Sequence, residues 1–173
     1  MDDRAKMPVD HHLRPINDGP TVTSYQAVMW HNLVYGTGLV TLTVLIHTIG
    51  LLSLGRSTPF LARRLGFHNS DIGRTLVMTG SVLGIFLLHT FEVWLWAWGY
   101  LQLAATARFS EALDLSTAMF STLGYGGGVA VSPDWRLMSA LEGINGFILI
   151  GWSTAYLVGV STRHGPFRAG DHF

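Results

Sequence analysis

The sequence has no cysteine and little charge, and these absences exclude several classes of protein. Without cysteine the chain forms neither a disulfide framework nor a thiolate metal site. Only 13% of its 173 residues are charged, about half the share found in a typical soluble domain. Basic and acidic residues number 11 each, so a net charge of zero gives no support for a nucleic-acid partner.

Apolar residues are abundant and are gathered into long stretches. They make up 49% of the chain, and the mean hydropathy is +0.34. Three stretches, at about 35–54, 76–103 and 137–160, reach the length of about 20 apolar residues that a bilayer requires. We therefore expect an all-α membrane protein rather than a soluble helical bundle. Residues 1–23 are polar and lack an early apolar core, so they do not resemble a cleaved signal peptide.

The segment that joins the first two spans is basic. Thr58-Pro59 favours the start of a short helix lying on the membrane surface, and an ordinary polar linker is the alternative. Clustered arginine is typical of the cytoplasmic side, which predicts an outside N-terminus and a cytoplasmic C-terminus in the inner membrane. Against the single acid Asp71, the basic residues of this segment are Arg56, Arg63, Arg64 and Arg74.

Between the second and third spans, a short helix is predicted from Ser110, as its N-cap, to Ser121. It is too short to cross the membrane, so it must enter, end and return through the glycine run 122–128. Non-helical backbone is tolerated at membrane depth only where it is buried in protein or lines a watery path. The negative end of the short helix would favour a cation there.

Residues 110–160 are similar to the pore domain of the tetrameric potassium-channel superfamily, in a small bacterial two-transmembrane type. The resemblance implies a potassium-channel-like pore domain with one additional N-terminal transmembrane helix. It implies that four copies conduct K⁺ passively, with no cofactor apart from the permeant ion. The matching residues are Ser121-Thr122-Leu123-Gly124-Tyr125-Gly126, Pro133, Trp135-Arg136 and Gly146.

The same resemblance assigns roles to individual residues. The ion ligands would be Thr122, Leu123, Gly124 and Tyr125, with conformational freedom supplied by Gly126. Filter support is expected from Asp114, Gly127 and Glu142, a gating hinge at Gly146, and cavity-facing side chains at Ile150 and Thr154. Gly127 replaces the aspartate usual in potassium channels, so a weakly selective cation channel is an alternative. A non-conducting regulatory subunit that retains the pore fold is another.

This reading divides the chain into five parts. They are a polar tail (1–27), the additional transmembrane helix (28–54), a basic cytoplasmic interfacial segment (55–75), the pore domain (76–160) and a short cytoplasmic tail (161–173).

Ionisable residues inside the spans are costly, so His47, His89 and Glu92 require a purpose. His89 and Glu92 lie three apart and share a helix face. A polar group that locks helices together and a pH sensor are both open interpretations. No nucleophile or metal-ligand spacing supports an enzyme. An aromatic run is predicted to form an interfacial belt: Trp94, Trp96, Trp98 and Tyr100.

Overall fold

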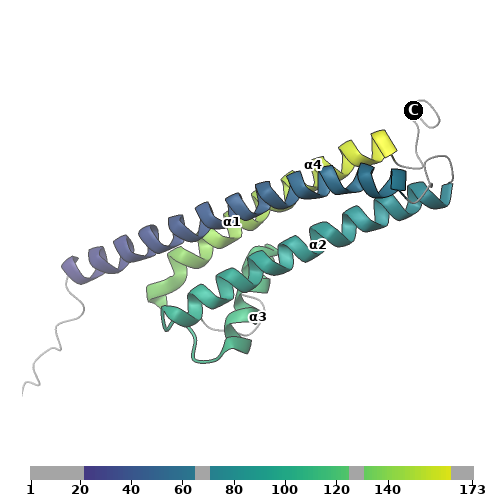
Figure 1. The fold of residues 1–173 in the computed structure, drawn as a ribbon. Helices are drawn as coiled ribbons and strands as arrows, with labels where there is room; N and C mark the ends of the chain where they lie inside the picture. Colours follow the sequence, from purple (N-terminus) through teal and green to yellow (C-terminus); the bar gives the residue numbers. More distant parts are fainter. Residues whose placement is uncertain (1–21, 65–70, 125–130, 165–173) are drawn as a thin grey trace, which may run out of the picture.

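The computed structural model describes residues 22–64, 71–124 and 131–164, which contain helices and turns and no strand. Three long helices run side by side, and a short one packs against two of them (Figure 1). The elements of the described ranges are α1 (Val22–Arg64), α2 (Asp71–Gln102), α3 (Phe109–Phe120), the 3₁₀ turn η2 (Pro133–Trp135) and α4 (Arg136–His164).

The three long helices are each long and apolar enough to cross a membrane. This confirms the prediction of three spans in an all-α protein. At 1.5 Å per residue, the 43 residues of α1 extend about 65 Å. That length exceeds the hydrocarbon thickness of about 30 Å, so α1 projects beyond the apolar layer.

One local prediction is wrong: no separate helix begins at Thr58. Instead α1 runs without a break to Arg64. The Thr58 hydroxyl donates to the Leu54 carbonyl 2.7 Å away, one turn earlier in the same helix. Extending an existing helix adds one bond per residue, whereas starting a new one requires a costly nucleus.

Contacts between side chains set the directions of the long helices. Asn145 donates to Thr43, and Ser153 lies beside His47, so positions increase together along α1 and α4. These two helices are therefore parallel. Glu92 meets His47, whereas Gly50 lies against Leu88, so α2 runs antiparallel to α1.

The buried core is concentrated where α3 packs against α2 and α4. Trp96 and Tyr100 are fully buried within it, whereas Trp94 and Trp98 are about half exposed. The prediction that all four form an interfacial belt is therefore wrong for Trp96 and Tyr100, which face the core. The buried members of this cluster are Trp96, Ala97, Tyr100, Ala112, Leu115, Met119, Phe120, Val131, Met138 and Leu149.

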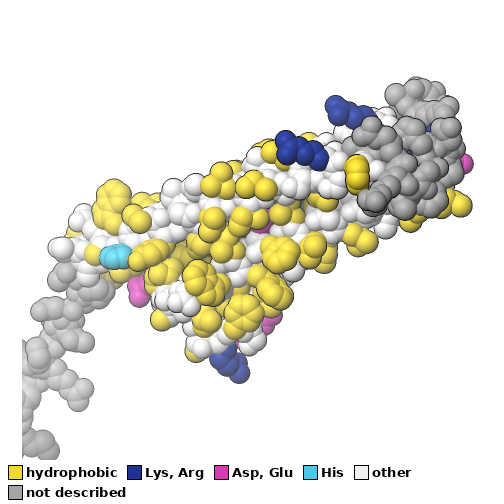
Figure 2. Space-filling model, in the orientation of Figure 1, with side chains coloured by type: hydrophobic (Ala, Val, Ile, Leu, Met, Phe, Trp, Pro, Cys, Tyr) yellow, Lys and Arg dark blue, Asp and Glu magenta, His cyan; other side chains and the backbone are white. Residues whose placement is uncertain are grey.

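The outer surface of the bundle is largely apolar. Hydrophobic side chains cover much of the visible face between the two ends (Figure 2). On α4, Phe147 is 70% and Ile144 60% exposed. A contiguous apolar surface of this kind marks contact with lipid or with other protein chains.

Candidate functional site

Helix α3 begins at Phe109 and is preceded by Arg108, whose backbone is extended. The Arg108 guanidinium donates to the Glu111 carboxylate at 2.7 Å, and this hydrogen bond lowers the pKa of Glu111. A negative charge at the start of a helix complements the helix dipole. Ser110 is not the N-cap, so that prediction is wrong by two positions. The acid in the first turn replaces the expected hydroxyl cap.

At its other end α3 turns sharply into the glycine run. The Ser121 N–H donates to the Thr117 carbonyl, and the Thr122 N–H donates to the Met119 carbonyl at 3.0 Å. Thr122 then takes a φ of +63° and Gly124 a φ of +72°. Positive φ is unusual for threonine and readily adopted by glycine. The chain thus leaves the helix through two residues with positive φ, a conformation that α-helices and β-strands do not use.

The first predicted ion ligands lie at this turn. Thr122 and Leu123 are exposed, Leu123 by 78%, and Gly124 is partly exposed. Their backbone is therefore not enclosed by the described part of their own subunit. The remaining predicted filter residues, Tyr125, Gly126 and Gly127, lie outside the described residues.

Glu142 lies on α4 behind α3 and is fully buried. The Ser116 hydroxyl of α3 donates to its Oε1 at 2.5 Å. The Tyr100 hydroxyl of α2 donates to its Oε2 at 2.6 Å. Glu142 is therefore bonded to the short helix α3 and to α2, and it joins three helices. Its role in supporting the filter remains a prediction.

Removing the Glu142 carboxyl is expected to destabilise the fold. In Glu142→Leu, the buried Tyr100 hydroxyl loses its acceptor, at a cost of about 1–3 kcal/mol. In the matched variant Glu142→Gln, the amide oxygen still accepts from Tyr100. Its NH₂ group can donate to Ser116, which also lies 2.9 Å from the Val93 carbonyl. Thermal midpoints in detergent should fall for Leu and stay near the parent value for Gln. Equal midpoints for the two variants would contradict this role.

Gly146 lies directly against the end of α3. A Cβ added there would lie 2.8 Å from both Cα and the carbonyl carbon of Phe120, and nearer still to its carbonyl oxygen. Gly146 is ten residues beyond the start of α4 at Arg136, about 15 Å along the helix. The C-terminal end of α3 therefore reaches well into the bundle. Gly146 therefore allows close packing of α4 against α3, and its role as a gating hinge stays a prediction.

The other predicted residues lie on outer faces. Asp114 is exposed on α3, and Thr154 is exposed on α4 with its hydroxyl bonded to the Ile150 carbonyl. Ile150 lines an open pocket of about 380 Å³, bordered by α2, α3 and α4. The pocket also reaches His89 and Phe120.

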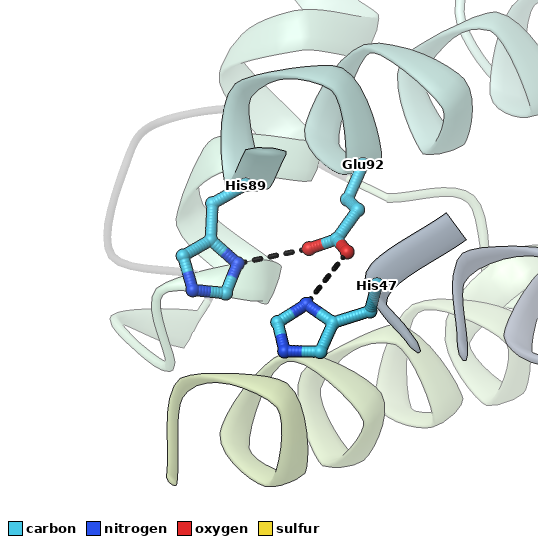
Figure 3. A group of neighbouring side chains, drawn as sticks. All are labelled: His47, His89 and Glu92. Atoms are coloured by element: carbon cyan, nitrogen blue, oxygen red, sulfur yellow. Dashed lines mark hydrogen bonds and ion pairs between the residues drawn. The ribbon is translucent and has the colours of Figure 1, made fainter. Parts of the chain in front are cut away.

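His47, His89 and Glu92 form one buried cluster (Figure 3). His47 Nδ1 lies 2.9 Å from Glu92 Oε1, and His89 Nδ1 lies 2.8 Å from Oε2. Both Nε2 atoms approach the Ser153 hydroxyl, at 3.4 Å and 3.1 Å. The cluster ties α1 to α2 and α4, in agreement with the helix-locking interpretation. Nothing in this geometry tests the pH-sensor interpretation.

Two further polar contacts hold α1 in register with α4. Asn32 accepts from the Met138 N–H at 3.0 Å, in the first turn of α4, and donates to the Asp134 carbonyl. Asn145 donates to the Thr43 hydroxyl at 2.9 Å. Polar bonds of this kind commonly join helices inside membranes.

Comparison with known proteins adds one finding. A family model described as "Ion channel" matches residues 86–163, from the middle of α2 to the end of α4. Residues 86–163 are therefore similar to this family and are called the ion-channel segment below. No curated protein and no solved structure matches the chain. With its three apolar spans, the protein is a multi-pass membrane protein. Helix α1 lies outside the matched range.

Several partners in these polar contacts escaped the sequence analysis. Ser116 and Ser153 are each directly followed by a threonine, and Tyr100 was assigned to the interface. Their only signal is a polar group within a helix that is mostly apolar. Such a signal does not identify the partner, because the partner comes from another helix.

Proposed function

We propose that four copies of this chain form a passive potassium channel. K⁺ would pass along a central axis lined by the backbone carbonyls of residues 122–125 and the Thr122 hydroxyl. Because one strand cannot surround an ion, the proposal requires a closed ring of subunits. Conduction, rather than catalysis, is then the activity of the chain.

The observation that carries the proposal is the position of α3. Its 12 residues extend about 18 Å, too little to cross a bilayer. Its C-terminal end lies beside Gly146, inside the bundle, and the turn Thr122-Leu123-Gly124 follows at once. The negative end of the helix dipole thus lies next to the proposed ion ligands, where it favours a cation. The whole arrangement falls within the ion-channel segment.

Exposed surfaces support an assembly of several chains. Leu123 at the turn and Phe147 on α4 are 78% and 70% exposed in the single subunit. In a ring, neighbouring copies would cover part of this apolar surface. The lipid bilayer would cover the remainder.

The parallel arrangement of α1 and α4 supports the proposed orientation. The N-terminal ends of both helices lie at the end of the bundle where α3 begins, as the contact of Asn32 with Met138 indicates. In this proposal that end faces outward from the inner membrane. The arginine-bearing end of α1, with Arg56, then faces the cytoplasm, in accordance with the positive-inside rule.

Purified protein in liposomes with a potassium gradient tests the proposal. We expect potassium flux that barium blocks, from a particle whose cross-linked mass equals four chains. Comparing potassium with sodium flux decides between a selective channel and the weakly selective alternative suggested by Gly127. A tetramer that gives no cation flux would leave the non-conducting regulatory subunit as the better interpretation.

A further inference from the structure

Two imidazole rings share one hydroxyl in the cluster of His47, His89, Glu92 and Ser153. The Nδ1 atoms of both histidines lie at hydrogen-bond distance from the Glu92 carboxylate. A ring that carries its hydrogen on Nδ1 presents a lone pair at Nε2. Ser153 has one hydroxyl proton and can donate to only one of the two Nε2 atoms. The other Nε2 therefore receives no hydrogen from Ser153.

This arrangement matches the way proteins prepare histidine for a metal. Metal-bound histidines usually donate their second N–H to a carboxylate, which sets the tautomer and the ring orientation. Here one carboxylate serves two histidines. Both Nε2 atoms are turned away from Glu92 and toward α4 (Figure 3). There they approach the same Ser153 hydroxyl, at 3.4 Å for His47 and 3.1 Å for His89.

The site can be reached from outside the subunit. His47 and Glu92 are fully buried, but the His89 side chain is 18% exposed. His89 also lines the open pocket of about 380 Å³. A metal ion can approach through this pocket, and water from the pocket can complete its coordination shell.

We propose that His47 and His89, oriented by Glu92, bind a divalent transition metal ion of the zinc class. Imidazole nitrogen suits zinc, copper and nickel, whereas magnesium and calcium prefer oxygen ligands. The ion joins α1, which lies outside the ion-channel segment, to α2 within it. The His89 ring also contacts the ring of Phe120, the last residue of α3, at a centroid distance of 5.5 Å. Binding thus stiffens the base of the turn at Thr122.

Metal binding is tested on the full chain, purified without a histidine tag and treated with EDTA. Titration with Zn²⁺ should give one bound ion per chain, and X-ray absorption should show imidazole nitrogen at about 2.0–2.1 Å. Glu92→Gln should weaken affinity about 10–100-fold, because an amide oxygen can orient only one of the two histidines. His47→Gln and His89→Gln should weaken affinity at least as much.

Control variants separate this site from other histidines. His31→Ala, on the exposed face of α1, should leave zinc affinity unchanged, as should the double variant His11→Ala/His12→Ala. Elution volume and thermal midpoint without metal identify any variant that fails to fold. Zinc binding that persists in His47→Gln and His89→Gln, or that disappears in the His11/His12 variant, overturns the proposal. Absence of zinc binding by the parent protein overturns it as well.

Binding is measured without ion flux, so it does not depend on the proposed function. Only the consequence for conduction rests on that function. Zinc binding by a protein that conducts no ions would remove the proposed function alone. Potassium flux from a protein that binds no zinc would remove the metal site alone.

Discussion

Gly124→Asp is expected to abolish potassium flux in liposomes while leaving the subunit folded. Gly124 has a φ of +72°, where a side chain adds about 1–3 kcal/mol of backbone strain. Among the described residues of its own subunit, a Cβ at this position meets no atom within 4 Å. The damage is therefore to the backbone conformation at the proposed ion ligands and not to subunit packing. Flux should fall to the level of liposomes without protein.

Gly151→Ala is the matched control for this variant. Gly151 lies in α4, and a Cβ there also has open space around it. Because its backbone is helical, alanine adds no strain, and flux should match the parent. Elution volume and cross-linked mass show whether each variant still assembles. A tetrameric Gly124→Asp protein with normal flux would exclude residues 122–124 from the ion path.

Gly146→Ala is expected to lower the stability of the protein. The new methyl group would overlap the backbone of Phe120, and backbone cannot move aside as a flexible side chain does. Overpacking of this kind costs about 1–3 kcal/mol. It would push α4 away from the end of α3 and displace the turn at Thr122. Both the thermal midpoint and the potassium flux should fall.

Two other glycines of α4 calibrate this result. A Cβ at Gly143 would lie 3.5 Å from the Met119 carbonyl oxygen, an ordinary contact, and a Cβ at Gly151 would meet nothing. Alanine at either position should keep or raise the free energy of unfolding, by up to about 1 kcal/mol from helix propensity, so the thermal midpoint should not fall. If Gly146 acts only as a hinge, Gly146→Ala will have the same thermal midpoint as these controls. It will then differ from them only in the fraction of time for which the proposed pore is open.

The number and approximate extent of the spans could be predicted because they follow from local composition. About 20 apolar residues cross a bilayer whatever surrounds them. Helix α2 begins five residues before the predicted range 76–103. Helix α4 begins one residue before the predicted range 137–160 and ends four residues after it. Helix boundaries were less predictable. Thr58-Pro59 carries the local signal of a helix start, yet α1 continues through it, since a preceding helix overrides that signal.

The parts of the candidate site that form one continuous stretch of sequence were predicted. The parts that depend on contacts between different helices were predicted less well. The turn after α3 follows from the order of short helix, threonine and glycines. Glu142 and His89 attract attention as polar residues within apolar helices. Their partners Tyr100 and Ser153 do not, because a tyrosine or serine in a span has several possible uses.

Composition and order along the chain are sufficient to establish a three-span helical membrane protein with a short helix and a glycine run between the last two spans. They also carry the resemblance to an ion channel. Which polar groups meet is a different kind of information. His47 is 45 residues from Glu92 and 106 from Ser153, yet all three belong to one buried cluster. Such contacts depend on the direction and register of packed helices, and these arise only when the helices assemble.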